Sequence, residues 1–249
     1  MWRRSAARVP CFAVHLLESC RARSKTGSSS FPYAGIMSLL FPKIYPILDS
    51  STIPASGRAR FLDRLGRSLA DAGVTLLEYR NKNGVDAEIL DDGEILRRAL
   101  PAGEAKLILD DRADLVGAME FDGVHVDAGD VSPVEARRLV GPGCIVGTFG
   151  GAEELVSGVL DEPVDYLSIG PVFLTTTKQT TKAPIGIKGV RRLRSQAGRD
   201  AILVAAAGIT LETAPEVLAA GANSVAVSAA IFGAADPAAE FRRWHDELG

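Results

Sequence analysis

The chain has 249 residues, of which 47% are hydrophobic and 6% aromatic, and this suits one domain with a core of Val, Leu, Ile and Ala. No apolar run reaches the roughly 18 residues of a membrane span, so we expect no membrane partner. The net charge of −3 conceals an asymmetry, because residues 1–36 carry +5 (six Arg or Lys against Glu18) and the remainder carries −8. The acidic remainder argues against nucleic acid as a partner, although a small anion can still bind at a local basic site.

Residues 1–36 are rich in Arg and Ser and show no sustained hydrophobic period. The composition is compatible with a transit peptide, whereas a signal peptide fits less well because Pro10 and His15 interrupt the apolar stretch. We favour a disordered extension, or a start placed too early, and expect residues 37–249 to form the working domain. The three cysteines of the chain form no disulfide framework and suit a reducing compartment such as the cytoplasm.

From Lys43 onward, short apolar runs alternate with helical patterns. The expected strands are residues 44–48, 74–77, 106–109, 123–126, 144–148, 164–169, 201–205 and 224–227. The expected helices lie around residues 61–69 and over 87–100, 113–119, a segment beginning at 132–133, 152–160, 188–196, 211–219 and 237–248.

Eight strand–helix units in a chain of this length predict an α/β fold, a single-domain (β/α)8 TIM barrel. An open doubly wound sheet is the alternative. It usually carries a Gly-rich phosphate fingerprint after its first strand, and the sequence that follows Asp49 is no such fingerprint. In a barrel, the functional side chains gather at the C-terminal ends of the strands.

The second expected strand continues into three charged residues, Glu78, Arg80 and Lys82, which are spaced by two and must point to the same side. Because a barrel strand is covered on both faces, we expect these charges at the open mouth, while Leu77 and Tyr79 face the helices.

Carboxylates follow the third and fourth strands as Asp110, Asp111 and Asp130. Carboxylates on neighbouring strand ends, completed by water and phosphate oxygens, suit Mg²⁺. For Asp111 and Asp130 taken alone, helix capping or pairing with Arg is an equally good interpretation. His125 lies within an apolar strand, and we interpret it as a packed core histidine.

A loop rich in Thr and Lys follows the sixth strand and offers Thr175, Thr177 and Lys178 as donors to a polyanion. Further along, Thr180, Thr181 and Lys182 are expected to form a flexible lid. Small residues end the seventh and eighth strands, at Gly208 and at Ser228–Ala229, where barrels often bind phosphate; close packing of helices on strands is the alternative.

The sequence has no dinucleotide fingerprint, no Cys/His pair and no Lys inside an apolar strand core. Transfer from a diphosphate, with two anionic ligands and a metal, therefore fits the remaining residues best.

Over residues 45–232, the chain resembles the thiamine phosphate synthase family, whose relatives the thiazole tautomerases share its fold. The motifs that carry the resemblance are Arg80 and Lys82, Asp111, residues 122–125 with Asp130, residues 170–178 and residues 222–232.

The resemblance implies that hydroxymethylpyrimidine diphosphate loses pyrophosphate and that the nitrogen of thiazole phosphate captures the resulting carbocation. It implies that Arg80, Lys82 and Lys178 hold the pyrophosphate and that Asp111 and Asp130 bind Mg²⁺. The substrate-binding residues that it implies are Glu78, Asp110, Thr175, Thr177, Gly208, Ser228 and Ala229.

The chain departs from the pattern of the family at several of these positions. The family usually has Gln at Glu78, Asn at Asp110, Gln-Glu at Ala128-Gly129, Gly at Ala207, Ser at Ala229 and a Ser-containing segment at residues 148–150. We expect Glu78 and Asp110 to add negative charge beside the pyrophosphate site, which weakens substrate binding or recruits metal.

Two alternatives to the synthase remain open. One is a tautomerase-type isomerase that uses His125 or a nearby carboxylate for proton transfer, and the other is a non-catalytic protein that binds thiazole or thiamine phosphate. The expected partners are small phosphorylated substrates, and a homo-oligomer is left open.

Overall fold

The computed structural model describes residues 41–175 and 182–249. The expectations for residues 1–36, for Thr177 and Lys178, and for Thr180 and Thr181 therefore lie outside the described residues. The chain divides into two units, Met1–Pro32 and Tyr33–Gly249, and all described residues belong to the second. Within the described ranges, every helix is too short or too polar to cross a lipid bilayer.

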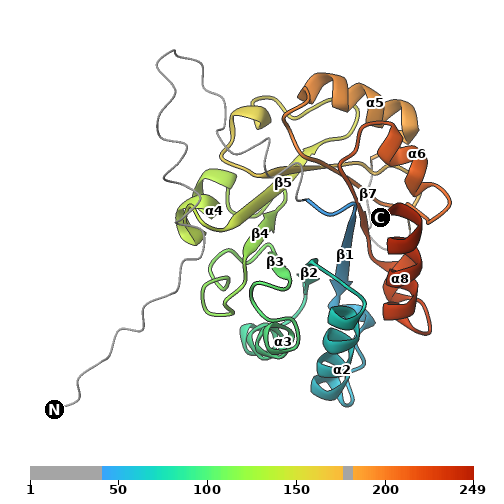
Figure 1. The fold of residues 1–249 in the computed structure, drawn as a ribbon. Coiled ribbons are helices and arrows are strands. Elements are labelled where there is room, and N and C mark those ends of the chain that lie inside the picture. Colours follow the sequence, from blue (N-terminus) through green and yellow to red (C-terminus); the bar gives the residue numbers. More distant parts are fainter. Residues whose placement is uncertain (1–40, 176–181) are drawn as a thin grey trace, which may run out of the picture. The chain divides into compact units, whose positions relative to one another are not determined.

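The structure confirms the predicted barrel. Eight parallel strands pair in chain order, and the eighth closes on the first (Figure 1). The strands are β1 (Ile44–Asp49), β2 (Leu76–Arg80), β3 (Lys106–Asp110), β4 (Gly123–Val126), β5 (Ile145–Gly151), β6 (Tyr166–Ile169), β7 (Leu203–Ala206) and β8 (Ser224–Val227).

Helices cover the outside of the barrel (Figure 1). The α-helices are α2 (Arg58–Asp71), α3 (Asp86–Ala99), α4 (Pro133–Val140), α5 (Gly186–Ala197), α6 (Ala214–Ala219), α7 (Ala229–Phe232) and α8 (Pro237–Leu248), and the short 3-10 helices are η2 (Ser50–Thr52) and η3 (Val159–Asp161). Two of these helices begin at a side chain that caps them. The Ser132 hydroxyl caps α4 by accepting from the Glu135 N–H, and the Asp236 carboxylate caps α8 by accepting from the Ala239 N–H.

Two predicted helices are wrong. Residues 113–120 form successive turns, and residues 152–160 hold bends, an isolated bridge at Leu155, turns and the start of η3. The first segment is too short to repay helix nucleation and contains Gly117, a poor helix former. In the second segment, Gly158 adopts φ +77°, which breaks a right-handed helix, and Leu155 bridges back to Gly151.

The core has two parts, one on each face of the sheet. The larger part lies between strands and helices and includes Leu77 and Tyr79, which face outward as predicted. The smaller part includes Phe41, Tyr45, Ile108 and Tyr166 and contains side chains that alternate with the outward-facing ones. On the strands that contribute to this smaller part, the apolar inner face continues toward the C-terminal end into the residues that line the site.

Candidate active site

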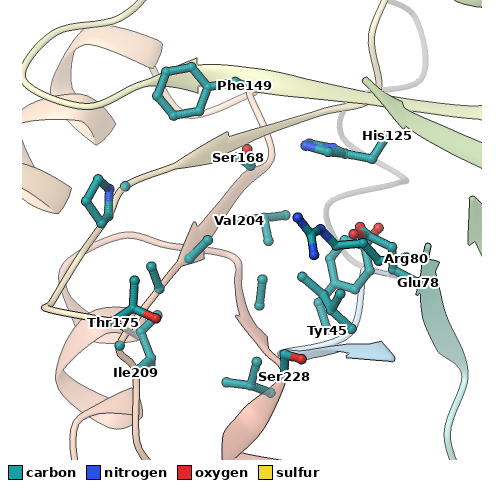
Figure 2. Close-up of a pocket in the computed structure, with 18 of the residues that line it drawn as sticks. Tyr45, Glu78, Arg80, His125, Phe149, Ser168, Thr175, Val204, Ile209 and Ser228 are labelled. Carbon is teal, nitrogen blue, oxygen red and sulfur yellow. The ribbon is translucent and has the colours of Figure 1, made fainter. Parts of the chain in front are cut away.

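A cavity of about 1080 Å³ opens at the C-terminal ends of the strands (Figure 2). Every strand contributes to its lining, and so do the loops that follow several of them. Its titratable lining residues are Tyr45, Asp49, Glu78, Arg80, Lys82, Asp110, His125, Asp127, Asp130, Tyr166 and Lys182.

The three charged residues that begin at the end of β2 all line this cavity, as their spacing predicts. Glu78 is the deepest of them, with only 3% of its surface exposed, whereas the side chains of Arg80 and Lys82 are 22% and 30% exposed. The expectation that all three sit at the open mouth is therefore correct for Arg80 and Lys82, while Glu78 lies below them inside the barrel.

Arg80, at the end of β2, and Lys82, two residues beyond it, are both paired with carboxylates at the ends of the neighbouring strands. Arg80 donates to Asp49 at the end of β1, and its Nε lies 3.3 Å from Asp110 Oδ2. Lys82 Nζ lies 2.9 Å from the same Asp110 oxygen and also bonds Asp111. Burial alone lowers the pKa of Lys82, but Asp110 and Asp111 outweigh it and raise the pKa above its usual value. Lys82 is therefore firmly cationic.

Glu78 and Asp110 are two buried carboxyl groups on adjacent strands, and both hold their protons more tightly than usual. Burial, together with the charge of Asp110, raises the pKa of Glu78 to about 7. Burial also raises the pKa of Asp110, although Lys82 and His125 oppose this. Near neutral pH, Glu78 is therefore poised between a neutral donor and a charged acceptor.

His125 belongs to a polar chain inside the barrel, so interpreting it as a core histidine alone is incomplete. Its Nδ1 lies 3.0 Å from the Tyr166 hydroxyl, which lies 2.8 Å from the Tyr45 hydroxyl. On the other side, its Nε2 lies 3.5 Å from Asp127 Oδ1. Burial lowers the pKa of His125, but Asp127 and Glu78 outweigh it and raise the pKa overall. Figure 2 shows His125 at the cavity, on the same side as Arg80 and Glu78.

Asp111 and Asp130 approach one another at the rim of the cavity. Asp130 lines both this cavity and a smaller one of about 480 Å³, and Asp111 lines the smaller one. Burial and the adjacent Asp111 carboxylate together raise the pKa of Asp130. Asp111 Oδ1 is buried without a hydrogen-bond partner, and the residue is held at φ +69°.

A divalent cation would fit between Asp111 and Asp130. It would offset the repulsion between the two carboxylates and would bind the Asp111 oxygen that has no hydrogen-bond donor. Within residues 41–175 and 182–249, no group of three or more His, Cys, Asp or Glu side chains has the arrangement of a metal site. Two carboxylates would leave the remaining coordination positions to water and phosphate oxygens, which suits Mg²⁺.

The opposite side of the cavity is built from small and hydroxyl-bearing residues. Thr175, Gly208, Ser228 and Ala229 all line it, and their binding of phosphate stays a prediction. The Ser228 hydroxyl is buried without a hydrogen-bond partner, so it is available to a ligand. A Cβ at Gly208 would lie 2.4 Å from the Leu174 carbonyl oxygen, so only glycine permits this approach of the loop that carries Thr175. Thr177 and Lys178 lie outside the described residues.

Two prominent lining residues were not expected from the sequence. Asp49 holds Arg80, and its only sequence signal was its place at the end of a strand. Phe149 lies on β5 beside Ser168 (Figure 2), where the sequence showed only a departure from the family pattern.

Comparisons with known proteins agree on one family. The family described as "Thiamine monophosphate synthase" matches residues 44–231. The chain is 42% identical over 191 residues to the thiamine-phosphate synthase of Koribacter versatilis. The matched region covers 77% of this chain and 89% of that protein. It is 36% identical over 178 residues to the thiamine-phosphate synthase of Agrobacterium fabrum. This match covers 70% of this chain and 81% of that protein.

Among solved structures, thiamine phosphate pyrophosphorylase from Pyrococcus furiosus superposes with a TM-score of 0.65 and 28% identity. The match covers 83% of this chain and 97% of that one. On the residues matched and on these identities, the chain belongs to the thiamine monophosphate synthase family.

Proposed function

We propose that the protein is a thiamine phosphate synthase, a transferase of thiamine biosynthesis. It would condense hydroxymethylpyrimidine diphosphate with thiazole phosphate and release pyrophosphate. Membership of the family and 42% identity to a protein of that name support this. The observation that carries the proposal is the contact of Lys82 with Asp111, which itself approaches Asp130. It supports the proposal because a cation that would bind the diphosphate lies beside two carboxylates that would bind the metal.

In this proposal, Arg80, Lys82 and Lys178 bind the departing pyrophosphate. Arg80 and Lys82 are already held by Asp49, Asp110 and Asp111, so they are oriented before the substrate arrives. Such fixed donors stabilise the charge that develops on the leaving oxygen as the C–O bond breaks.

Asp111 and Asp130 would hold Mg²⁺, which supplies charge neutralisation for the leaving diphosphate. The lining contains five carboxylates, Asp49, Glu78, Asp110, Asp127 and Asp130, against the cations Arg80, Lys82 and Lys182. Among the described residues, carboxyl groups thus outnumber cations in the lining, and a diphosphate without metal would add further negative charge. We therefore expect binding of the diphosphate to depend more steeply on Mg²⁺ than it would in a pocket without Glu78 and Asp110.

The thiazole phosphate would occupy the opposite side, against Thr175, Thr177, Gly208, Ser228 and Ala229. The ring nitrogen donates its electron pair to the methylene carbon of the pyrimidine, and the electrons of the broken C–O bond leave with pyrophosphate. No proton needs to be removed at this step. Glu78 and Asp110 would lie beside the pyrimidine and the pyrophosphate.

The test is to incubate the full chain with both precursors and Mg²⁺ and to assay thiamine phosphate and pyrophosphate. Lys178→Ala and Asp130→Ala should abolish pyrophosphate release, while Glu94→Gln on the exposed face of α3 should leave it unchanged. Turnover that persists in both of the first two variants would refute the synthase assignment.

A second candidate, an isomerase of the tautomerase type, is favoured by the contacts of His125 with Tyr166 and Asp127. Such a reaction needs a proton donor and acceptor and neither pyrophosphate nor metal. It predicts turnover of a thiazole carboxylate phosphate alone that survives Asp130→Ala and is lost in His125→Gln.

A further inference from the structure

The loop that follows β2 carries a cation of the cavity, Lys82, beyond the end of the sheet. The register pairs of β2 end at Tyr79 on the β3 side and at Arg80 on the β1 side. Lys82 lies two residues further on, yet its ammonium nitrogen lies 2.9 Å from Asp110 Oδ2 and also bonds Asp111. The loop itself must therefore hold the backbone of Lys82 in place.

The side chain of Asn81 is the centre of this loop. Its Nδ2 donates to the Tyr79 hydroxyl at 3.0 Å and to Glu88 Oε1 at 2.8 Å, and its Oδ1 accepts from the Gly84 N–H at 2.8 Å. A carboxylate can only accept and a backbone N–H can only donate, so these partners fix which way round the amide lies. One planar group thus makes three hydrogen bonds to three different parts of the chain.

Each of the three partners of this amide is itself held in the fold. Tyr79 is buried on the outer face of β2, and its hydroxyl donates to Asp92. Glu88 lies in the first turn of α3, so its place is set by that helix. A Cβ at Gly84 would lie 2.3 Å from Asn81 Nδ2, so a side chain there would displace the amide. Asn81 therefore connects the loop to β2, to α3 and to the far end of the loop.

The amide of Asn81 makes these contacts on the side of the chain away from the cavity. Arg80 and Lys82 line the cavity, whereas Asn81 lies between them in the sequence and bonds the outward-facing Tyr79. Side chains alternate along β2, and this placement continues the alternation beyond its end. A ligand in the cavity would therefore meet Lys82, and any influence of Asn81 on that ligand would pass through the backbone that the two residues share.

We propose that Asn81 is a positioning residue, which holds the Lys82 ammonium where the departing pyrophosphate needs it. This inference rests on the proposed function, in which Lys82 binds that anion. Lys82 carries its charge on a flexible four-carbon stem, so a fixed backbone removes part of the freedom that binding would otherwise have to order. The contacts with Asp110 and Asp111 fix the other end of the same stem.

The experiment measures the affinity for pyrophosphate in the presence of Mg²⁺ by titration calorimetry with the full chain, in a double-mutant cycle of Asn81→Ala and Lys82→Ala. Lys82→Ala should lower this affinity by about 10-fold or more, the range of a hydrogen bond to a charged group. Asn81→Ala should lower it by about 3- to 10-fold in the wild-type background and by less than about twofold in the Lys82→Ala background. Such coupling is expected of a residue that acts through Lys82.

Thermal unfolding of the same four proteins separates positioning from a purely structural role. Asn81→Ala should lower the melting temperature by a similar amount in both backgrounds, because the three hydrogen bonds of its amide do not involve the Lys82 side chain. Asn83→Ala removes an exposed asparagine from the same loop and should change neither the affinity nor the melting temperature. If Asn81→Ala does not fold, Glu88→Leu, which removes one acceptor from the amide, takes its place in the cycle.

An equal loss of affinity for Asn81→Ala in both backgrounds would show a general effect on the site and overturn the inference, as would no loss in either background. Where Lys82→Ala still weakens binding in these two cases, the proposed function stands and the inference alone fails. A wild type that does not bind pyrophosphate with Mg²⁺, or that binds it no better than Lys82→Ala does, would refute the proposed function and the inference together.

Discussion

Asp49 and Arg80 are register partners on β1 and β2, and the guanidinium of Arg80 donates to the Asp49 carboxylate. The same carboxylate accepts from the Ser51 N–H at 2.9 Å and from the Ser51 hydroxyl at 2.5 Å. The Asp49 side chain therefore caps η2, links the ends of β1 and β2 and orients Arg80, which lines the cavity. This relationship is invisible along the sequence, because 31 residues separate the two partners.

Asp49→Asn should lower the free energy of unfolding by about 1–3 kcal/mol at pH 7, since it weakens hydrogen bonds to a charged group. Burial raises the pKa of Asp49, but Ser51 and Arg80 outweigh it, so the pKa lies below its ordinary 3.8. The Asp49 carboxylate therefore contributes its full stabilisation of the fold above pH 3.8, and this stabilisation is lost as pH falls through the folded-state pKa of Asp49. Urea unfolding at pH 7 and pH 3 should show the variant converging on the wild type. Asp63→Asn, which removes an exposed pair with Arg67, should have little effect at either pH.

Glu78→Gln should stabilise the protein at alkaline pH. Because the pKa of Glu78 rises from 4.5 to about 7 in the folded state, its stabilising contribution is complete below pH 4.5 and is lost as pH rises through 7. Glutamine stays neutral, so the variant should exceed the wild type by up to roughly 3 kcal/mol at pH 8 and match it near pH 4.5. Thermal melts over this range measure the difference, with Glu94→Gln as the matched loss of one exposed charge. A difference that does not vary with pH would contradict the raised pKa.

On the outer face of β2, Asp92 holds the side chains of Arg58 and Tyr79 in a hydrogen-bonded cluster that stabilises the fold. Its two carboxylate oxygens share the Arg58 Nε–H, each at 3.0 Å, and it accepts further hydrogen bonds from Arg58 Nη2 at 2.6 Å and from the Tyr79 hydroxyl. The residue is 2% exposed. Asp92→Ala should destabilise by about 3 kcal/mol, because it takes the buried carboxylate partner from a half-buried guanidinium and leaves Glu88, 3.4 Å from Arg58 Nη2, as the remaining acidic neighbour. The triple change Arg58→Met, Tyr79→Phe and Asp92→Leu should recover most of that loss in urea unfolding. A triple variant no more stable than Asp92→Ala would show that the polar contacts themselves carry the energy, rather than the loss of the carboxylate that faces Arg58.

Ala207 is a non-glycine residue at φ +76°, next to Gly208 at φ +68°. Its carbonyl accepts from the Phe173 N–H at 3.1 Å, so the neighbouring loop holds it in this conformation. Ala207→Gly should stabilise the protein by about 1 kcal/mol, because a Cβ in the left-handed region costs about that much. Ala220→Gly, at φ −75°, is the matched control and should destabilise instead. Equal effects of the two changes on the melting temperature would exclude backbone strain at Ala207.

The sequence predicts those features that depend on local period. The bounds of β4, β8 and α8 agree with the predicted ranges 123–126, 224–227 and 237–248, because capping residues, apolar runs and turns mark them clearly. The shared face of Glu78, Arg80 and Lys82 follows from alternation alone. The pairing of Arg80 with Asp49 depends on inter-strand register, which no local pattern encodes. The approach of Asp111 to Asp130 likewise depends on a left-handed backbone at Asp111, an uncommon conformation for aspartate that only tertiary packing selects.

The pairing of β8 with β1 has a consequence for self-association. An open sheet leaves two outer strands with unpaired backbone groups, which another chain can extend. In the part of the chain that the structure describes, the sheet closes on itself, so every barrel strand has a neighbour on both sides. Any oligomer formed by this part must therefore use side chains of its helices and loops, and it cannot grow by adding strands to the sheet.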